Sequence, residues 1–231
     1  MTPALVLPSS LGTTSELWDE NVGYWSGTFR LLPYTQKGRS SVEQLGRGLV
    51  ELAGDSERVS ICGLSLGGAA AMWVAANVPE RVDRLVLACT SARFGEPRLW
   101  LERAAVVREH GLEPIADEIV GRWFTPAAPA EVVARFRQML VDTPRDDYAA
   151  CCEALAHWDF RDRLGEIQAP TLVIAAAEDS ATPPEHAELL ANGIPDAKLV
   201  VLPDAAHLPN VEQPEVFSKL VAHHLAPVEV A

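Results

Sequence analysis

The sequence predicts an α/β protein with a mainly parallel sheet of about six strands and helices on both faces of that sheet. Short apolar runs alternate with helix-like stretches along most of the chain, which is typical of parallel strands joined by crossover helices. The 231 residues, 48% of them hydrophobic, suffice for one domain with a large core. Helical patterning without strands interrupts the alternation over residues 95–158, which indicates an inserted cap above the carboxyl ends of the strands.

The first part of the chain predicts two strands and two helices. The apolar run Ala4–Pro8 predicts a buried strand, and residues 16–25 predict a short helix. A second strand is expected over residues 29–34. Pro33 cannot donate a hydrogen bond to a neighbouring strand, so this strand should lie at the edge of the sheet. Apolar residues at helical spacing predict a helix over residues 42–52.

The rest of the chain continues the pattern around the helical insertion. Residues 1–94 and 159–231 are expected to form the core domain and residues 95–158 the cap, with a loosely packed tail at 226–231. The elements expected after the second helix are strands at 58–62, 82–89, 171–176 and 197–202, and helices at 69–77, 100–111, 113–123, 130–142, 146–158, 184–192 and 214–225.

A glycine-rich segment, Gly63-Leu-Ser-Leu-Gly-Gly68, joins a predicted strand to a predicted helix. The G-x-S-x-G pattern in this setting is typical of a nucleophile elbow, a sharp turn that presents a serine. Residues two positions from that serine must be small, because strand and helix nearly touch there, and Gly63 and Gly67 satisfy this requirement. The alternative is a turn that only joins the two elements. The pattern therefore makes Ser65 a candidate nucleophile.

A serine nucleophile needs a histidine base, and the histidine needs an acid that orients it. Asp179 follows the strand at 171–176 and His207 follows the strand at 197–202, so both should reach the carboxyl edge where Ser65 lies. The alternatives are that Asp179 caps the next helix, that Glu178 is the acid, or that His207 is a surface residue. The other histidines fall in helix-like stretches.

Two backbone N–H groups are needed to stabilise the oxyanion of the tetrahedral intermediate. Leu66 follows the nucleophile and supplies one, and Leu11, in the loop after the first strand, is the candidate for the other. Gly12 permits the turn that this second donor requires. The alternative for Leu11 is an apolar plug in an ordinary loop.

Composition excludes several classes of partner. A formal net charge of −13 argues against binding nucleic acid, and no apolar segment is long enough to cross a membrane. The first residues lack the basic region of a signal peptide, and no spacing of ligands suggests a metal site. The cysteines, Cys62, Cys89, Cys151 and Cys152, are expected to be reduced thiols in a cytoplasmic protein.

Several stretches resemble the α/β-hydrolase superfamily, and within it the 3-oxoadipate enol-lactone hydrolases. They are residues 9–18 (SSLGTTSELW), 62–68 (CGLSLGG), 79–87 (PERVDRLVL), 122–126 (RWFTP), 169–174 (APTLVI) and 204–215 (DAAHLPNVEQPE). This resemblance implies an α/β-hydrolase fold, with Ser65 as nucleophile, Asp179 as acid and His207 as base. It also implies hydrolysis of an enol-lactone to 3-oxoadipate in aromatic catabolism, without a cofactor.

The chain departs from the family pattern at its beginning. Such proteins usually start with two further strands, which are not expected here, and the loop after Tyr34 is shorter than usual. Loss of these strands would leave residues 29–34 at the edge of the sheet, where Pro33 would block further pairing.

The implied substrate carries a carboxylate, so an arginine is expected in the pocket. Arg122 on the cap is the candidate, with Trp123 and Trp158 as apolar walls; the alternative for these residues is packing and solvation. The predicted function is hydrolysis of a small carboxylic lactone or ester. A broad carboxylesterase with the same triad and a non-catalytic protein that binds small ligands are the alternatives. The sequence does not determine the oligomeric state.

Overall fold

The computed structural model describes residues 2–226, which form an all-parallel, six-stranded sheet in the order β2-β1-β3-β4-β5-β6. The expected fold class is therefore confirmed. The loosely packed tail expected at 226–231 lies outside the described residues, except for residue 226. The strands are β1 (Ala4–Pro8), β2 (Arg30–Tyr34), β3 (Val59–Leu64), β4 (Val82–Ala88), β5 (Thr171–Ala176) and β6 (Ala197–Leu202).

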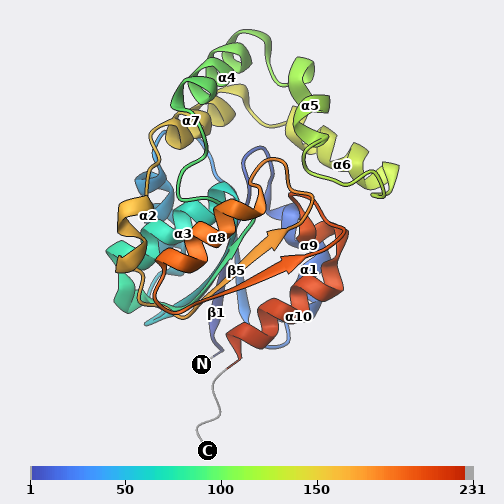
Figure 1. Cartoon of the computed structure of the whole chain (residues 1–231). Helices are drawn as coiled ribbons and strands as arrows, with labels where there is room; N and C mark the ends of the chain where they lie inside the picture. Colours follow the sequence, from blue (N-terminus) through green and yellow to red (C-terminus); the bar gives the residue numbers. More distant parts are fainter. Residues whose placement is uncertain (1, 227–231) are drawn as a thin grey trace, which may run out of the picture.

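Helices cover both faces of the sheet, with α2, α3 and α8 on one side and α1, α9 and α10 on the other (Figure 1). All residues of β3 and β5 are buried, as expected of central strands covered on both faces. The helices are α1 (Asp19–Trp25), α2 (Val42–Ala53), α3 (Leu66–Asn77), α4 (Pro97–His110), α5 (Ala116–Val120), α6 (Ala130–Val141), α7 (Arg145–Ala156), α8 (Pro184–Gly193), α9 (Pro209–Glu212) and α10 (Pro214–Leu225).

Strand β2 lies at one edge of the sheet, as the sequence predicts. The Arg30 N–H donates to the carbonyl of Pro3, just before β1, and the Tyr34 carbonyl accepts from the N–H of Ser9, just after β1. Arg30 and Tyr34 therefore direct their backbone groups toward β1. Because backbone groups alternate in direction along a strand, the nitrogen of Pro33 faces the open edge. The missing N–H of Pro33 therefore removes a donor from the one side of β2 that no strand of the described chain covers.

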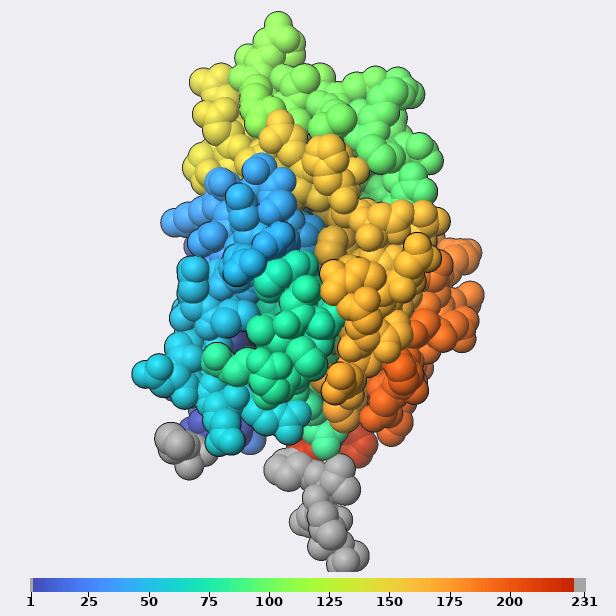
Figure 2. All heavy atoms as spheres, turned by 90° about the vertical axis from the view of Figure 1, so that its left-hand side faces the viewer, coloured from blue at the N-terminus to red at the C-terminus, as the bar shows by residue number. Residues whose placement is uncertain are grey.

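Helices α4 to α7 lie together beyond the carboxyl ends of the strands, separated from the helices that flank the sheet (Figure 1). Figure 2 shows this segment, green to gold, seated on one end of the molecule, with the blue segment that precedes α2 directly beneath it. Helices α4 and α7 pack against each other and bury Ala104, Val107 and Cys152. None of the described helices is long and apolar enough to cross a membrane.

The prediction of one helix over residues 113–123 is wrong in its extent, because the helical segment there is shorter. A 3-10 turn at Glu113–Ile115 precedes the five-residue helix α5. After α5, the N–H groups of Arg122 and Trp123 bond to carbonyls three residues earlier, so the chain tightens into turns instead of continuing the helix. These turns place Arg122 and Trp123 at the wall of the cavity described below.

Candidate active site

Ser65 occupies a strained turn between β3 and α3, with φ 54° and ψ −118°. Backbone angles of this kind are costly for a residue with a Cβ atom and persist only where surrounding contacts hold them. Here the Ser65 N–H donates to the Ala88 carbonyl at 3.0 Å, and the Thr90 hydroxyl donates to the Ser65 carbonyl at 2.6 Å. Contacts with β4 and the loop after it therefore fix the serine in this conformation.

The glycines around Ser65 are required by close backbone contacts. A Cβ atom at Gly63 would lie 2.5 Å from the Gly67 carbonyl oxygen, and one at Gly67 would overlap the carbonyl oxygen of Pro8. Because these neighbours are backbone atoms, they cannot rotate away as a side chain can. The small residues of the G-x-S-x-G pattern thus allow β1, β3 and α3 to meet at the turn.

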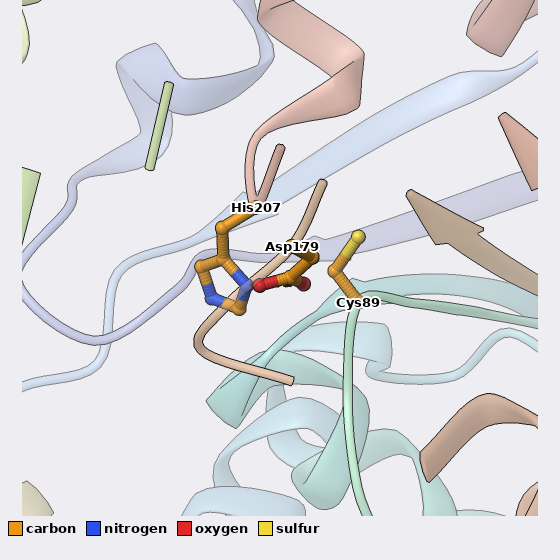
Figure 3. Close-up of side chains that lie close together, drawn as sticks. All are labelled: Cys89, Asp179 and His207. Carbon is orange, nitrogen blue, oxygen red and sulfur yellow. Dashed lines mark hydrogen bonds and ion pairs between the residues drawn. The ribbon is translucent and has the colours of Figure 1, made fainter. Parts of the chain in front are cut away.

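Asp179 and His207 come together from the loops that follow β5 and β6 (Figure 3). His207 Nδ1 lies 2.8 Å from Asp179 Oδ2, and both residues are only 3% exposed. Glu178, the rival acid, is exposed to solvent. The arrangement directs the other ring nitrogen of His207 away from Asp179, as a catalytic base requires.

The Asp179 carboxylate is held by donors from its own loop. Oδ1 accepts from the N–H groups of Ala181 at 2.8 Å and Thr182 at 3.0 Å, and Oδ2 accepts from the Thr182 hydroxyl at 2.7 Å. Burial tends to raise the pKa of Asp179, but the charge of His207 and these hydrogen bonds outweigh it and lower the pKa below its usual value. The carboxylate is therefore ionised beside His207. It does not cap α8, which begins at Pro184 with Pro183 as its N-cap.

Thr182 is a member of this cluster that the sequence analysis missed. Its hydroxyl lies 2.7 Å from Asp179 Oδ2 and 3.4 Å from His207 Nδ1. The spacing of a threonine three residues after an aspartate, in a loop that follows a strand, is the signal that could have identified it.

Cys89 lies on the other side of Asp179 from His207 (Figure 3). Its Sγ atom, a carboxylate oxygen of Asp179 and a ring nitrogen of His207 all lie within 4.8 Å of one another, which is a possible set of metal ligands. Burial raises the pKa of Cys89 well above its usual value, so the thiol is protonated. A cation at this place would have to replace both the thiol proton and the Asp179–His207 contact.

The backbone supplies two N–H groups in the positions expected of an oxyanion hole. Leu66 is the first residue of α3, where an N–H has no partner within the helix. Leu11 and Gly12 are the central residues of a turn closed by the Thr13 N–H on the Ser10 carbonyl, and Gly12 has φ 75°. Within residues 2–226, neither the Leu11 nor the Leu66 N–H bonds to another protein group. Both remain available to a substrate oxygen.

A cavity of about 90 Å³ joins Ser65, His207 and Leu11. Arg122 and Trp123 line it as well, but Trp158 does not. The Trp158 ring stacks on Phe160 at 4.8 Å, and its indole N–H donates to the Ser91 carbonyl. The remaining lining residues are Ser10, Phe94, Trp100, Arg103, Ile119, Tyr148, Leu155, Ala181 and Thr182.

A larger cavity, of about 630 Å³, lies beside this one and shares Ser10, Leu11 and Tyr148 with it. It is lined by the loop after β2, including Gln36 and Lys37, and by residues of α6 and α7, but by neither Ser65 nor His207. Although this cavity is larger, the one that contains both Ser65 and His207 is the candidate active site.

Hydrogen bonds connect the loop that holds His207 to the chain segment after α5. The Leu208 N–H donates to the Trp123 carbonyl at 3.1 Å. Glu212 accepts from the Thr125 N–H and hydroxyl with one oxygen and from the Ala206 N–H with the other, at 2.7–2.8 Å. The position of the histidine and that of the cavity wall are thus coupled through Glu212, a residue that the sequence analysis did not single out.

Known proteins resemble this chain over nearly its whole length. The 3-oxoadipate enol-lactonase 2 of Acinetobacter baylyi is 36% identical, over 95% of this chain and 87% of its own length. The crystal structure of an enol-lactonase from Burkholderia xenovorans superposes with a TM-score of 0.93 at 34% identity, covering 97% of this chain and 92% of the other. A thermophilic esterase from Thermogutta terrifontis, solved with malate bound, gives 0.88 at 28% identity, covering 96% and 89%.

A family model described as the alpha/beta hydrolase fold matches residues 40–214, which include Ser65, Asp179 and His207. This match covers well over half of the chain, and it agrees with the parallel sheet and with the turn at Ser65. The chain therefore belongs to the α/β-hydrolase family.

Proposed function

We propose that this protein is a serine hydrolase that cleaves small carboxylic lactones or esters. The observation that carries the proposal is the single cavity that Ser65 shares with His207, whose Nδ1 is bonded to the buried carboxylate of Asp179. Ser65, Asp179 and His207 form the catalytic triad in this proposal. In this proposal, residues 2–94 and 159–226 of the described chain form the core that holds the triad, and residues 95–158 form the cap that encloses the substrate.

The proposed reaction proceeds in two halves. Nε2 of His207 takes the Ser65 hydroxyl proton as Oγ attacks the substrate carbonyl, and the oxyanion accepts from the Leu11 and Leu66 N–H groups. The proton then passes from His207 to the leaving oxygen, which leaves an acyl-enzyme. In the second half, His207 takes a proton from water, the hydroxide attacks the acyl carbon, and Ser65 recovers its proton from His207. Asp179 stays ionised throughout and stabilises the imidazolium.

An enol-lactone that yields 3-oxoadipate, in aromatic catabolism, is the substrate that we propose. The likeness to two enol-lactonases over nearly the whole chain supports it. A substrate of this kind carries a carboxylate, and Arg122 and Trp123 line the cavity in which it would bind. No cofactor takes part in this reaction. The four cysteines are free, which suits a cytoplasmic setting.

A broader carboxylesterase with the same triad is the second candidate. The likeness to an esterase favours it, although that relative was solved with malate, a small dicarboxylate. A protein that binds a ligand without hydrolysing it is the third, and the available oxyanion donors weigh against this reading.

Hydrolysis of the enol-lactone and of short p-nitrophenyl esters by the wild type and Ser65→Ala tests the proposal. We expect the wild type to prefer the lactone and to react with a fluorophosphonate probe, and Ser65→Ala to lose about 10⁴-fold or more in kcat for every substrate. Preference for the neutral esters would favour the broad esterase. Turnover that survives in Ser65→Ala would exclude the serine mechanism, and a wild type that does not react with the probe would favour the ligand-binding reading.

A further inference from the structure

Two arginines line the active-site cavity, and they differ in their partners. Arg122, from the turn after α5, bonds to Glu118 Oε1 at 2.7 Å, and its side chain is 46% exposed. Arg103, from α4, is half-buried and has no carboxylate within 4.0 Å anywhere in residues 2–226. The positive charge that the cavity leaves uncompensated therefore belongs to Arg103.

The other arginines of α4 show that this difference follows from the position on the helix. Arg98 bonds to Glu102 and Arg108 bonds to Glu153, each at 2.6 Å. Acidic groups are not scarce, since the chain has 32 aspartates and glutamates against 19 lysines and arginines. Of these three arginines, the one without an acidic partner is the one that lines the cavity.

The surroundings of Arg103 fix the guanidinium group without neutralising it. Its Cζ lies 4.9 Å from the centre of the Trp100 ring, which is within the range of a cation–π contact. Tyr148 is buried beside it; burial is the main cause of the raised pKa of this phenol, and the Arg103 charge acts against the rise. Phe94, Ile119 and Leu155 provide apolar walls in the same cavity.

We propose that Arg103 binds the carboxylate of the substrate and thereby selects acids over neutral esters. In a mainly apolar cavity, an anionic partner strongly stabilises the charge of a guanidinium group. The planar guanidinium can also donate two parallel hydrogen bonds to one carboxylate. Arg122 already shares its charge with Glu118 and contributes less to this contact. This inference rests on the proposed hydrolase function, and it specifies the substrate as a small acyl compound with a carboxylate distal to the scissile carbonyl.

The test compares two esters of nearly equal shape, mono-p-nitrophenyl glutarate and p-nitrophenyl valerate. They differ in a terminal carboxylate against a terminal methyl group. For Arg103→Gln we expect KM for the glutarate ester to rise about tenfold or more, with kcat changed by less than about threefold and valerate hydrolysis changed by less than about twofold. Arg103→Lys should recover part of the lost affinity, because it keeps the charge but not the fork.

Arg98→Gln is the matched control, since it removes an arginine of the same helix that lies outside the cavity. It should leave both esters unaffected. Free glutarate provides a second readout, because its inhibition constant should rise in Arg103→Gln as KM does. Equal losses for both esters in Arg103→Gln, or an unchanged KM for the glutarate ester, would overturn the inference.

Ser65→Ala separates this inference from the proposed function. If Ser65→Ala no longer hydrolyses either ester, while Arg103→Gln affects hydrolysis of the two esters equally, the serine mechanism stands and only the role of Arg103 is wrong. If Ser65→Ala retains turnover of both esters, the proposed function fails.

Discussion

His207 Nδ1 and Asp179 Oδ2 lie 2.8 Å apart, and almost no surface of either residue is exposed to water. Their loops follow adjacent parallel strands, β5 and β6, so the sheet itself determines the distance between them. Because solvent does not screen this pair, the ionisation of Asp179 affects both the position of the imidazole and the stability of the fold.

Asp179→Asn should change the acid dependence of stability. The pKa of Asp179 is lowered in the folded protein, so the unfolded chain binds its proton at a higher pH. The carboxylate therefore contributes stability above its unfolded pKa of about 4, and this contribution is lost as pH falls through the lower folded pKa. Urea unfolding from pH 6 to pH 2 should give a difference between wild type and variant that shrinks below about pH 4. A difference that stays constant would contradict the assignment.

Thr182→Val should reduce catalysis by loosening the acid. The hydroxyl of Thr182 donates to the same oxygen that contacts His207, and valine keeps the shape but removes the donor. We expect kcat to fall about five- to tenfold with little change in KM. Thr182→Ser keeps the hydroxyl and should restore most of the rate, whereas a loss of equal size in both variants would point to packing instead.

Ser65→Gly should stabilise the protein while it abolishes turnover. The φ of 54° at Ser65 is unfavourable for a residue with a Cβ atom, and glycine adopts it without steric cost. We expect the free energy of unfolding to rise by about 0.5–1.5 kcal/mol, since the flexibility of unfolded glycine offsets part of the gain. Ser65→Ala retains the Cβ atom and should show no comparable rise. Chemical denaturation measures both, and equal stabilities of the two variants would count against strain at Ser65.

Gly67→Ala should destabilise the fold, because its Cβ atom would overlap the carbonyl oxygen of Pro8 in β1. We expect a loss of about 2–3 kcal/mol in the free energy of unfolding. Gly23→Ala is the matched control: Gly23 is exposed within α1 and a Cβ atom there has no neighbour within 4 Å. Gly23→Ala should raise the free energy of unfolding by about 0.5–1 kcal/mol. Similar effects of the two substitutions would show that the elbow tolerates a side chain.

The sequence by itself determined the features that arise from local sterics and from strand order. Gly63 and Gly67 identify the turn at Ser65 because only glycine fits such close backbone contacts. Pro33 predicts the edge position of β2 because proline lacks an N–H. The loops that hold Asp179 and His207 were recognisable because parallel strands end at a common edge, where those loops meet.

The tertiary structure decided which side chains become partners across elements. The spacing of Arg98 and Glu102 already allows a pair along one helix, but only the packing of α4 shows that Arg108 meets Glu153 and that Arg103 lines the cavity without an acidic partner. Packing likewise directs Trp158 onto Phe160 and away from the cavity. The Arg108–Glu153 pair and the bond from the Trp158 indole N–H to the Ser91 carbonyl join residues far apart in the chain, so they depend on distances that no local pattern encodes.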